Sequence, residues 1–208
     1  MKKYLSILTI TLTIICVGSN SDAEYRITDQ DRADITRVEI YLNGLKSLRS
    51  KFVQLSSDGS FAEGNIYIER PNRMRLDYTR PPNIQVYADG FWLAHVDTEL
   101  GSVSRIPLKL TPANFLIRER LRLSGDLMVQ HVTRDAKTLS LEVVRKDEPK
   151  AGKYVITLAE KPLALRKWVV TDAQGIRTSV TLISPEYNVI IPKKVFIFDE
   201  PVTEPEIQ

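Results

Sequence analysis

Most of this chain consists of short stretches in which apolar and polar residues alternate. Turn signals such as Asp58-Gly59, Asp89-Gly90 and Gln174-Gly175 separate many of them. The stretches are 52–55, 61–69, 74–78, 84–87, 91–96, 127–133, 139–145, 154–158, 165–171, 178–183 and 194–198. Alternation with a period of two is typical of half-buried β-strands. Short strands at this spacing predict one antiparallel sheet or barrel.

Only two segments have the period of a helix. The first covers 28–50, and its start has a capping-box pattern in Thr28 and Asp31. Its apolar residues, three or four positions apart, are Ile35, Val38, Leu42, Leu45 and Leu48. The second covers 111–118, with Pro112 in a place that suits a first helical turn. Two helices cover little of such a sheet, so we expect either a closed barrel or an open one with a hollow.

The N-terminus has the pattern of a secretory signal peptide. Lys2 and Lys3 precede an apolar run over 4–17, and small or polar residues follow up to Ala23. The run is too short to span a membrane. Cys16, the one cysteine, is expected to leave with the signal, because lipidation needs a small residue just before the cysteine, and an isoleucine stands there.

The predicted division is therefore a cleaved signal peptide over 1–23 and a single domain over 24–208, with a Pro- and Glu-rich tail from about 200. The mature domain contains no cysteine, so burial and hydrogen bonding must hold the fold without disulfides. We expect a soluble, exported protein.

The charges are nearly balanced, with 29 basic and 26 acidic residues. Proteins that bind nucleic acid usually have a clear excess of basic residues, which this chain lacks, so we expect no nucleic-acid partner. The densest positive patch is Arg118, Arg120 and Arg122. Solvated surface is its simpler interpretation, and an acidic partner or lipid headgroups are the alternative.

Residues for catalysis or metal binding are sparse. The two histidines, His95 and His131, lie far apart and lack the spacing of zinc ligands. No nucleophile elbow or phosphate-binding glycine loop is present. His95 and Asp97 share a strand face beside a turn, where an exposed polar edge explains them as well as a general base does. We therefore expect no enzyme, no metal and no cofactor.

Arg70, which precedes Pro71, is in phase with apolar residues. If the proline does not shift the register, the same side carries Ile66, Ile68, Met74, Leu76 and Tyr78. Two interpretations stay open. Either Pro71 ends a strand and Arg70 extends to water, or the guanidinium is desolvated and donates to carbonyls of a covering segment, which would make it a latch.

The chain resembles the LolA family, the periplasmic lipoprotein carriers of Gram-negative bacteria. The matching features are Phe52-Val53-Gln54, Gly64, Arg70-Pro71-Asn72, Arg75-Leu76-Asp77-Tyr78, Pro82, Asp89-Gly90, Asp97, Pro107-Leu108, Thr111-Pro112, Leu165, Trp168, Asp172, Gly175, Phe196 and Phe198. They cover nearly the whole mature chain, and the first half is the more specific. Two departures are Val96, where an aromatic residue is common, and the basic stretch 118–122.

The resemblance implies an incomplete antiparallel β-barrel, mainly β with a few helices, half open and covered by helical lid segments. It implies a hydrophobic cavity for the acyl chains of lipoproteins, with Arg70 and Pro71 as the latch of the lid. It also implies partners: an inner-membrane lipoprotein-releasing ABC transporter that supplies the cargo and an outer-membrane acceptor that receives it. We expect the carrier to be a monomer.

The side chains expected to line this cavity come from the first half of the sheet and the second helix. They are Phe52, Ile66, Ile68, Met74, Leu76, Tyr78, Ile84, Val86, Trp92, Phe115 and Leu116. Plain hydrophobic core is the alternative interpretation of each. The alternative function is a non-enzymatic envelope scaffold or lipid-sensing β-barrel protein without lipoprotein cargo.

Overall fold

A single antiparallel sheet of eleven strands dominates the computed structural model, which describes residues 25–198. The strands are β1 (Ser47–Ser56), β2 (Phe61–Glu69), β3 (Arg73–Arg80), β4 (Ile84–Asp89), β5 (Trp92–Asp97), β6 (Ser102–Pro107), β7 (Leu127–Arg134), β8 (Thr138–Arg145), β9 (Gly152–Glu160), β10 (Leu163–Asp172) and β11 (Arg177–Tyr187). The predicted signal peptide and the tail from about 200 lie outside the described residues.

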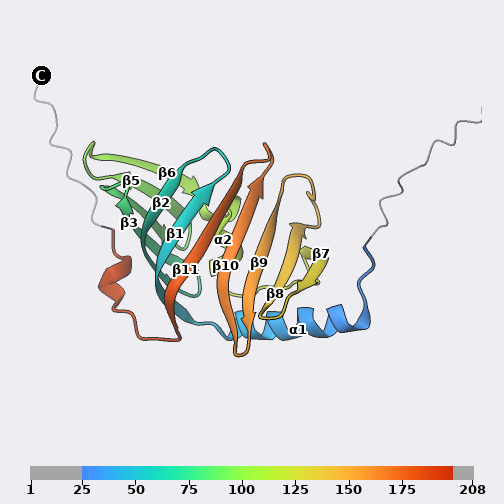
Figure 1. Cartoon of the computed structure of the whole chain (residues 1–208). Helices are drawn as coiled ribbons and strands as arrows, with labels where there is room; N and C mark the ends of the chain where they lie inside the picture. The colour runs from blue at the N-terminus through green and yellow to red at the C-terminus, as the bar shows by residue number, and fades with distance from the viewer. Residues whose placement is uncertain (1–24, 199–208) are drawn as a thin grey trace, which may run out of the picture.

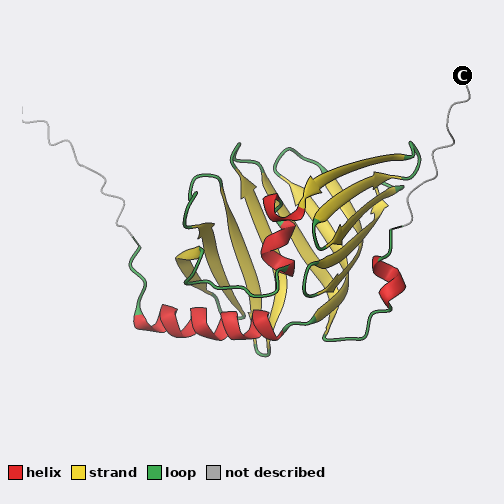
Figure 2. Cartoon of the chain, turned by 180° about the vertical axis from the view of Figure 1, so that it is seen from behind, coloured by secondary structure: helices red, strands yellow, loops and turns green. Residues whose placement is uncertain are grey.

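The order of strands leaves the sheet open. It runs β6-β5-β4-β3-β2-β1-β11-β10-β9-β8-β7, so the first and last strands pair at the centre and β6 and β7 are the two edges. The sheet curves strongly, with α2 (Ala113–Ile117) on its concave face and α1 (Asp29–Gly44) across one end (Figures 1 and 2). The predicted fold class, an incomplete antiparallel barrel covered by helices, is confirmed.

A close approach between β2 and β3 explains Gly64. The register between these strands shifts there, and a Cβ at this position would collide with the backbone carbonyl oxygen of Asp77. Only glycine fits such a contact without displacing a strand.

The start of α1 is fixed by polar contacts. Thr28 and Asp31 form the predicted capping box. Asp31 is fully buried, and both Asp31 and Asp34 pair with Arg134 of β7, at 2.7 and 2.6 Å. Burial raises the pKa of Asp31, but hydrogen bonds from Thr28, Arg134 and Tyr25 outweigh it and leave that pKa below its usual value. These acids therefore anchor the helix to the sheet.

The predicted extent of the first helix was wrong, because α1 ends at Gly44 rather than near residue 50. Leu45 and Leu48 are buried as expected, but Leu48 belongs to β1. On this strand Leu48, Ser50 and Phe52 are buried at every second position. Leu48 therefore fits both a helical and a strand period, and the sequence pattern alone did not separate them.

Two further points of the strand assignment need correction. The strand predicted over 194–198 is a short helix, η2 (Lys193–Phe196), which follows Pro192. Edge strand β6 was not predicted, because its exposed side chains show little alternation. The segment around η2 packs on β3 and β4: Arg75 donates to the carbonyl oxygen of Val195 at 3.1 Å.

A covering segment lies on the concave face. It comprises η1 (Leu108–Leu110), α2 and the loop that follows to residue 123. We call residues 108–123 the lid. The helix predicted over 111–118 is thus present as α2, shortened to five residues.

Candidate functional site

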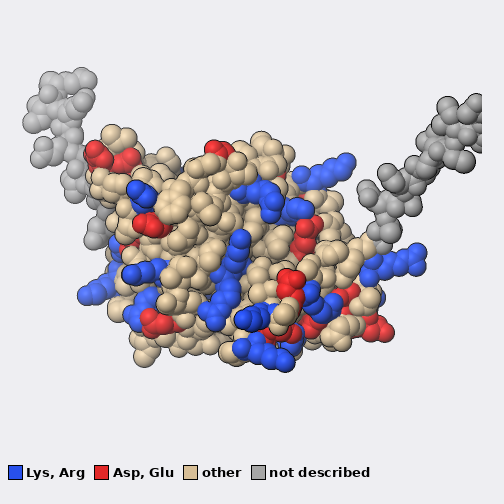
Figure 3. Space-filling model, viewed as in Figure 1, with Lys and Arg blue, Asp and Glu red and all other residues tan. Residues whose placement is uncertain are grey.

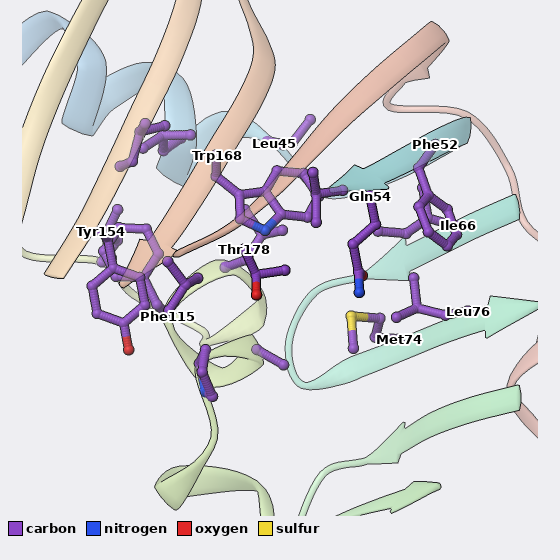
Figure 4. A pocket seen from close by; sticks show the side chains of 18 of the residues that line it. Leu45, Phe52, Gln54, Ile66, Met74, Leu76, Phe115, Tyr154, Trp168 and Thr178 are labelled. Atoms are coloured by element: carbon purple, nitrogen blue, oxygen red, sulfur yellow. The ribbon is translucent and has the colours of Figure 1, made fainter. Parts of the chain in front are cut away.

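A cavity of about 300 Å³ lies between the concave face of the sheet and the lid (Figure 4). Its first wall is formed by β1–β3 and contributes Phe52, Gln54, Ile66, Met74 and Leu76. Its second wall is formed by β9–β11 with the β10–β11 turn and contributes Tyr154, Ile156, Trp168, Val170, Asp172, Ile176, Thr178 and Val180. Arg70, Leu42 and Leu45 close one end, and the lid adds Pro112, Ala113, Phe115, Leu116 and Leu121. The lining is mostly apolar, as sites for apolar ligands are.

The cavity meets solvent away from Arg70. Three of its lining residues are exposed: Asp172 and Ile176 at the β10–β11 turn, and Pro112 before α2. Gln54 and Thr178 add polar groups to the lining near this turn. The buried end, by contrast, is lined by Leu42, Leu45 and Leu121 together with Arg70. The lining is therefore mostly buried near Arg70 and partly exposed at the β10–β11 turn.

Six of the predicted cavity residues line this space, and five do not. Those that do are Phe52, Ile66, Met74, Leu76, Phe115 and Leu116. Ile68 and Val86 are buried in the core instead, Ile84 lies on β4 beyond the cavity, and Tyr78 packs edge-on against Phe52 at 5.3 Å. Trp92 is 46% exposed and lies on the outer face of the sheet. It shares a face of β5 with Ala94 and Val96, whose cross-strand partners flank Val86 and therefore lie on the face opposite to it.

None of the second-wall residues was among the cavity residues predicted from the sequence. A signal was present, because Tyr154 and Ile156 are two residues apart, as are Thr178 and Val180. The pairing brings Trp168 opposite both Ile156 and Val180, and Val180 opposite Gln54 of β1. Recognising this wall required knowing that β11 pairs with β1.

Arg70 holds the lid through backbone carbonyls. Its Nε and Nη2 donate to the carbonyl oxygen of Arg118 at 2.9 and 2.6 Å, and Nη2 also reaches that of Glu119 at 3.5 Å. Its Nη1 donates to the carbonyl oxygens of Leu42 and Leu45. Burial lowers the pKa of Arg70, and the charge of Arg118 lowers it further. Of the two interpretations of Arg70, the structure therefore shows the one in which the guanidinium donates hydrogen bonds to carbonyls of a covering segment.

Pro71 does not line the cavity. The residue after it, Asn72, donates its backbone N–H to the carbonyl oxygen of Ile117 at 2.7 Å. The Arg-Pro-Asn turn therefore contacts the lid at adjacent points.

The opposite side of the lid is held by an aromatic pair. The rings of Phe115 on α2 and Tyr154 on β9 stack with centroids 4.6 Å apart and planes 11° apart. Burial raises the pKa of Tyr154, although the charges of Arg145 and Arg118 act against this rise.

Other candidate groups have structural contacts. Asp97 accepts the backbone N–H groups of Glu99 and Leu100 in the turn after β5, at 3.0 and 2.9 Å. His131 lies against the ring of Tyr25, with centroids 3.9 Å apart.

Across residues 25–198, no three His, Cys, Asp or Glu side chains are placed to hold a metal ion. In this part of the chain, no helix is long and apolar enough to cross a membrane. Figure 3 shows basic and acidic side chains mixed over the outer face of the sheet.

Residues 43–199 match the family model described as outer membrane lipoprotein carrier protein LolA. The chain belongs to the LolA family. A relative from Methylococcus capsulatus, named outer-membrane lipoprotein carrier protein, is 25% identical over 201 residues and 92% of each chain. A relative of the same name from Leptothrix cholodnii is 28% identical over 179 residues, which are 80% of this chain and 82% of that one.

The fold also occurs in solved structures. A crystal structure of an uncharacterized conserved protein from Thermus thermophilus matches with a TM-score of 0.50 and 8% identity, over 82% of this chain and 96% of that chain. This likeness concerns the fold alone. Membership of the LolA family places the chain among lipoprotein carriers, in agreement with the expectation that it is not an enzyme.

Proposed function

We propose that this LolA-family protein binds the acyl chains of lipoproteins in the cavity between its two walls and carries them through the periplasm. The observation that carries the proposal is the mostly apolar cavity of about 300 Å³ beneath the lid. The residues argued to form the binding site are those that line it, with Arg70 as the latch of the lid. The signal-peptide pattern at residues 1–23 supports export.

A carrier of this kind needs a way to release its cargo. Burying a methylene is worth about 0.8 kcal/mol, so a chain of about sixteen carbons gains on the order of 12 kcal/mol by leaving water. A cavity that was always open would hold such a chain too tightly. A lid that closes in the absence of cargo competes with binding and lowers the apparent affinity.

The size of the cavity supports this role for the lid. About 300 Å³ is at the small end of ligand pockets, which span roughly 300–1,000 Å³. A long acyl chain would therefore displace the lid and break the contacts of Arg70 with Arg118 and Glu119. We infer that the structure represents a form with the lid closed.

The partners follow from the carrier role. We propose that an inner-membrane lipoprotein-releasing ABC transporter loads the protein and that an outer-membrane acceptor unloads it. The relatives from Methylococcus capsulatus and Leptothrix cholodnii are named outer-membrane lipoprotein carrier proteins, which supports lipoproteins as the cargo. The transfer itself would need no cofactor on the carrier, since closing of the lid lowers the affinity of the carrier for its cargo.

The two tryptophans allow a direct test of the site. Trp168 lines the cavity and Trp92 lies on the outer face. In a Trp92→Phe variant, Trp168 is the one fluorescent tryptophan. A lipopeptide whose acyl chain carries bromine atoms quenches a tryptophan that it touches, so we expect strong quenching in this variant.

The matched control is Trp168→Phe, which keeps Trp92. We expect little quenching there, and none in either variant with the same peptide lacking its acyl chain. Equal quenching of both tryptophans would place the chain outside the cavity. No quenching of Trp168 at any concentration would refute the proposed function and favour an envelope scaffold without lipid cargo.

A further inference from the structure

The loop that follows α2 runs alongside α1, as Figure 2 shows. Two side chains of α1 bind its backbone. The Asn43 side chain makes two hydrogen bonds to one residue: its Nδ2 donates to the carbonyl oxygen of Leu121, and its Oδ1 accepts the N–H of Leu121, both at 2.9 Å. One turn earlier, Glu39 Oε2 accepts the N–H of Leu123 at 2.7 Å.

The spacing of these contacts matches the two chains. Glu39 and Asn43 are four residues apart, which is about 6 Å along a helix and places both on one face. Leu121 and Leu123 are two residues apart, which is up to about 7 Å along an extended chain. Both leucines are only 2% exposed. The helix therefore binds alternate residues of the loop, while the leucine side chains point into the protein.

These contacts bear directly on the cavity. Leu121 lines it, as do Leu42 and Leu45, one and two residues from Asn43 in sequence. The backbone groups bound by Asn43 belong to the same loop as the Arg118 and Glu119 carbonyls bound by Arg70. The end of the lid is thus held from two directions, by the Arg-Pro turn and by α1.

We propose that Asn43 and Glu39 form a second clamp on the lid, and that this clamp acts with Arg70 to keep the empty cavity closed. They are positioning residues, since neither lines the cavity and both act through Leu121 and Leu123. This inference rests on the proposed function, because it concerns how the same cavity admits its lipid. It also implies that Arg70 is only part of the latch.

The clamp has a measurable consequence for binding. If the cavity binds lipid only when the lid is open, the apparent dissociation constant equals the intrinsic one divided by the open fraction. Losing the clamp raises that fraction. Ligand should then bind more tightly, through faster association and without faster dissociation. Damage to the cavity itself would instead weaken ligand binding.

The test uses the mature protein and a fluorescent fatty acid as the probe. Asn43→Leu removes both hydrogen bonds at similar side-chain size, and Asn43→Asp keeps only the acceptor for the N–H of Leu121. We expect about tenfold faster association for Asn43→Leu, which corresponds to the loss of one or two hydrogen bonds, and a smaller change for Asn43→Asp. The control Asn65→Leu changes a half-buried asparagine on β2, whose side chain has no hydrogen bond within the described residues, and should match the wild type.

Amide hydrogen exchange tests the clamp without any lipid. In Asn43→Leu, the amides of Leu121 and Leu123 should exchange at least tenfold faster while strand amides keep their protection. Unchanged exchange, or faster exchange with unchanged or weaker probe binding, would overturn the proposal. If the wild-type protein does not bind the probe at all, the proposed function and the role of the clamp in lipid binding both fail, while the exchange data still decide whether Asn43 holds the lid.

Discussion

The two walls of the cavity hold the lid by different physical means. On the side of the first wall, Arg70 donates hydrogen bonds to the backbone of Arg118 and Glu119. On the side of the second wall, Phe115 stacks on Tyr154 without any hydrogen bond between them in the described structure. Hydrogen bonds have strict geometry and are lost with small displacements. Ring stacking buries area and tolerates sliding.

This difference suggests a division of labour. The aromatic pair supplies stability, because it buries a large side chain whatever the exact position of the lid. The arginine supplies a defined closed position that a ligand can compete with. Four predictions test this division, from the largest expected effect to the smallest.

Removing the aromatic side chain from the lid should cost the most stability. Phe115→Ala is expected to lower the free energy of unfolding by about 3 kcal/mol, as truncation of a buried phenylalanine does. Urea denaturation measures this value. The control is Leu116→Ala on the same helix, where the half-buried side chain should cost about half as much. Equal losses would show that Phe115 has no special part in holding the lid.

Removing the latch should change binding more than stability. Arg70→Leu is expected to bind a fluorescent acyl probe about tenfold more tightly and to transfer lipoprotein to acceptor correspondingly more slowly, because the closed lid competes less with the ligand. Arg70→Lys keeps the positive charge but loses the planar set of N–H donors of the guanidinium. Its probe affinity and transfer rate should therefore lie between those of the wild type and of Arg70→Leu. The exposed Arg26, changed to Leu, is the control. Unchanged or faster transfer by Arg70→Leu would remove Arg70 from this role.

The ring of Tyr154 should matter more than its hydroxyl. Tyr154→Leu loses the stack and is expected to lower the free energy of unfolding by about 1 kcal/mol beyond the lost area, the usual worth of an aromatic pair. Tyr154→Phe keeps the stack and should change it by less than about 0.5 kcal/mol. A larger loss in the Phe variant than in the Leu variant would mean that the hydroxyl, and not the ring, holds α2.

The pKa values of two tyrosines, one on each wall, should show the smallest of the four effects. Burial raises the pKa of Tyr78 and of Tyr154 above the ordinary value of 10.0. The folded protein then holds these protons more tightly than the unfolded chain, so stability is unaffected below about pH 10 and falls as the pH rises beyond it. In Phe115→Ala, which removes the ring stacked on Tyr154, the pKa of Tyr154 should fall toward 10.0, while that of Tyr78, packed behind Phe52, should stay raised. In Arg70→Leu the stack remains, so both pKa values should stay raised.

Nuclear magnetic resonance of ring-labelled tyrosines follows each titration, with Tyr78→Phe and Tyr154→Phe to assign the signals. Equal falls in the pKa of both tyrosines in Phe115→Ala would show that the stack does not act on the second wall alone.

The sheet was predictable because its strands are amphipathic. The alternation of Phe61–Glu69 and Leu163–Asp172 is visible in the sequence, and both form strands. Features fixed by tertiary contacts were not predictable. Leu48 satisfies two periods at once, so the end of α1 depends on the pairing of β1 with β2 and β11. The exposed edge strand β6 has no buried face to produce a pattern.

The cavity was predictable on one side only. Ile66, Met74 and Leu76 lie on consecutive strands, so local alternation places them together. Trp168 and Val180 reach the same space because β11 returns to pair with β1, more than a hundred residues away in the chain. The contacts of Asn43 and Glu39 with the lid connect segments about eighty residues apart and leave no periodic signal.

The central claim is that the cavity between the two walls receives acyl chains. Native mass spectrometry of the protein purified from the cell envelope under mild conditions tests it most directly. We expect a fraction of the protein to carry an acylated molecule, which wild-type protein loses to an acceptor and Arg70→Leu retains. A protein that is always free of lipid, and stays so after incubation with lipoprotein, would contradict the claim.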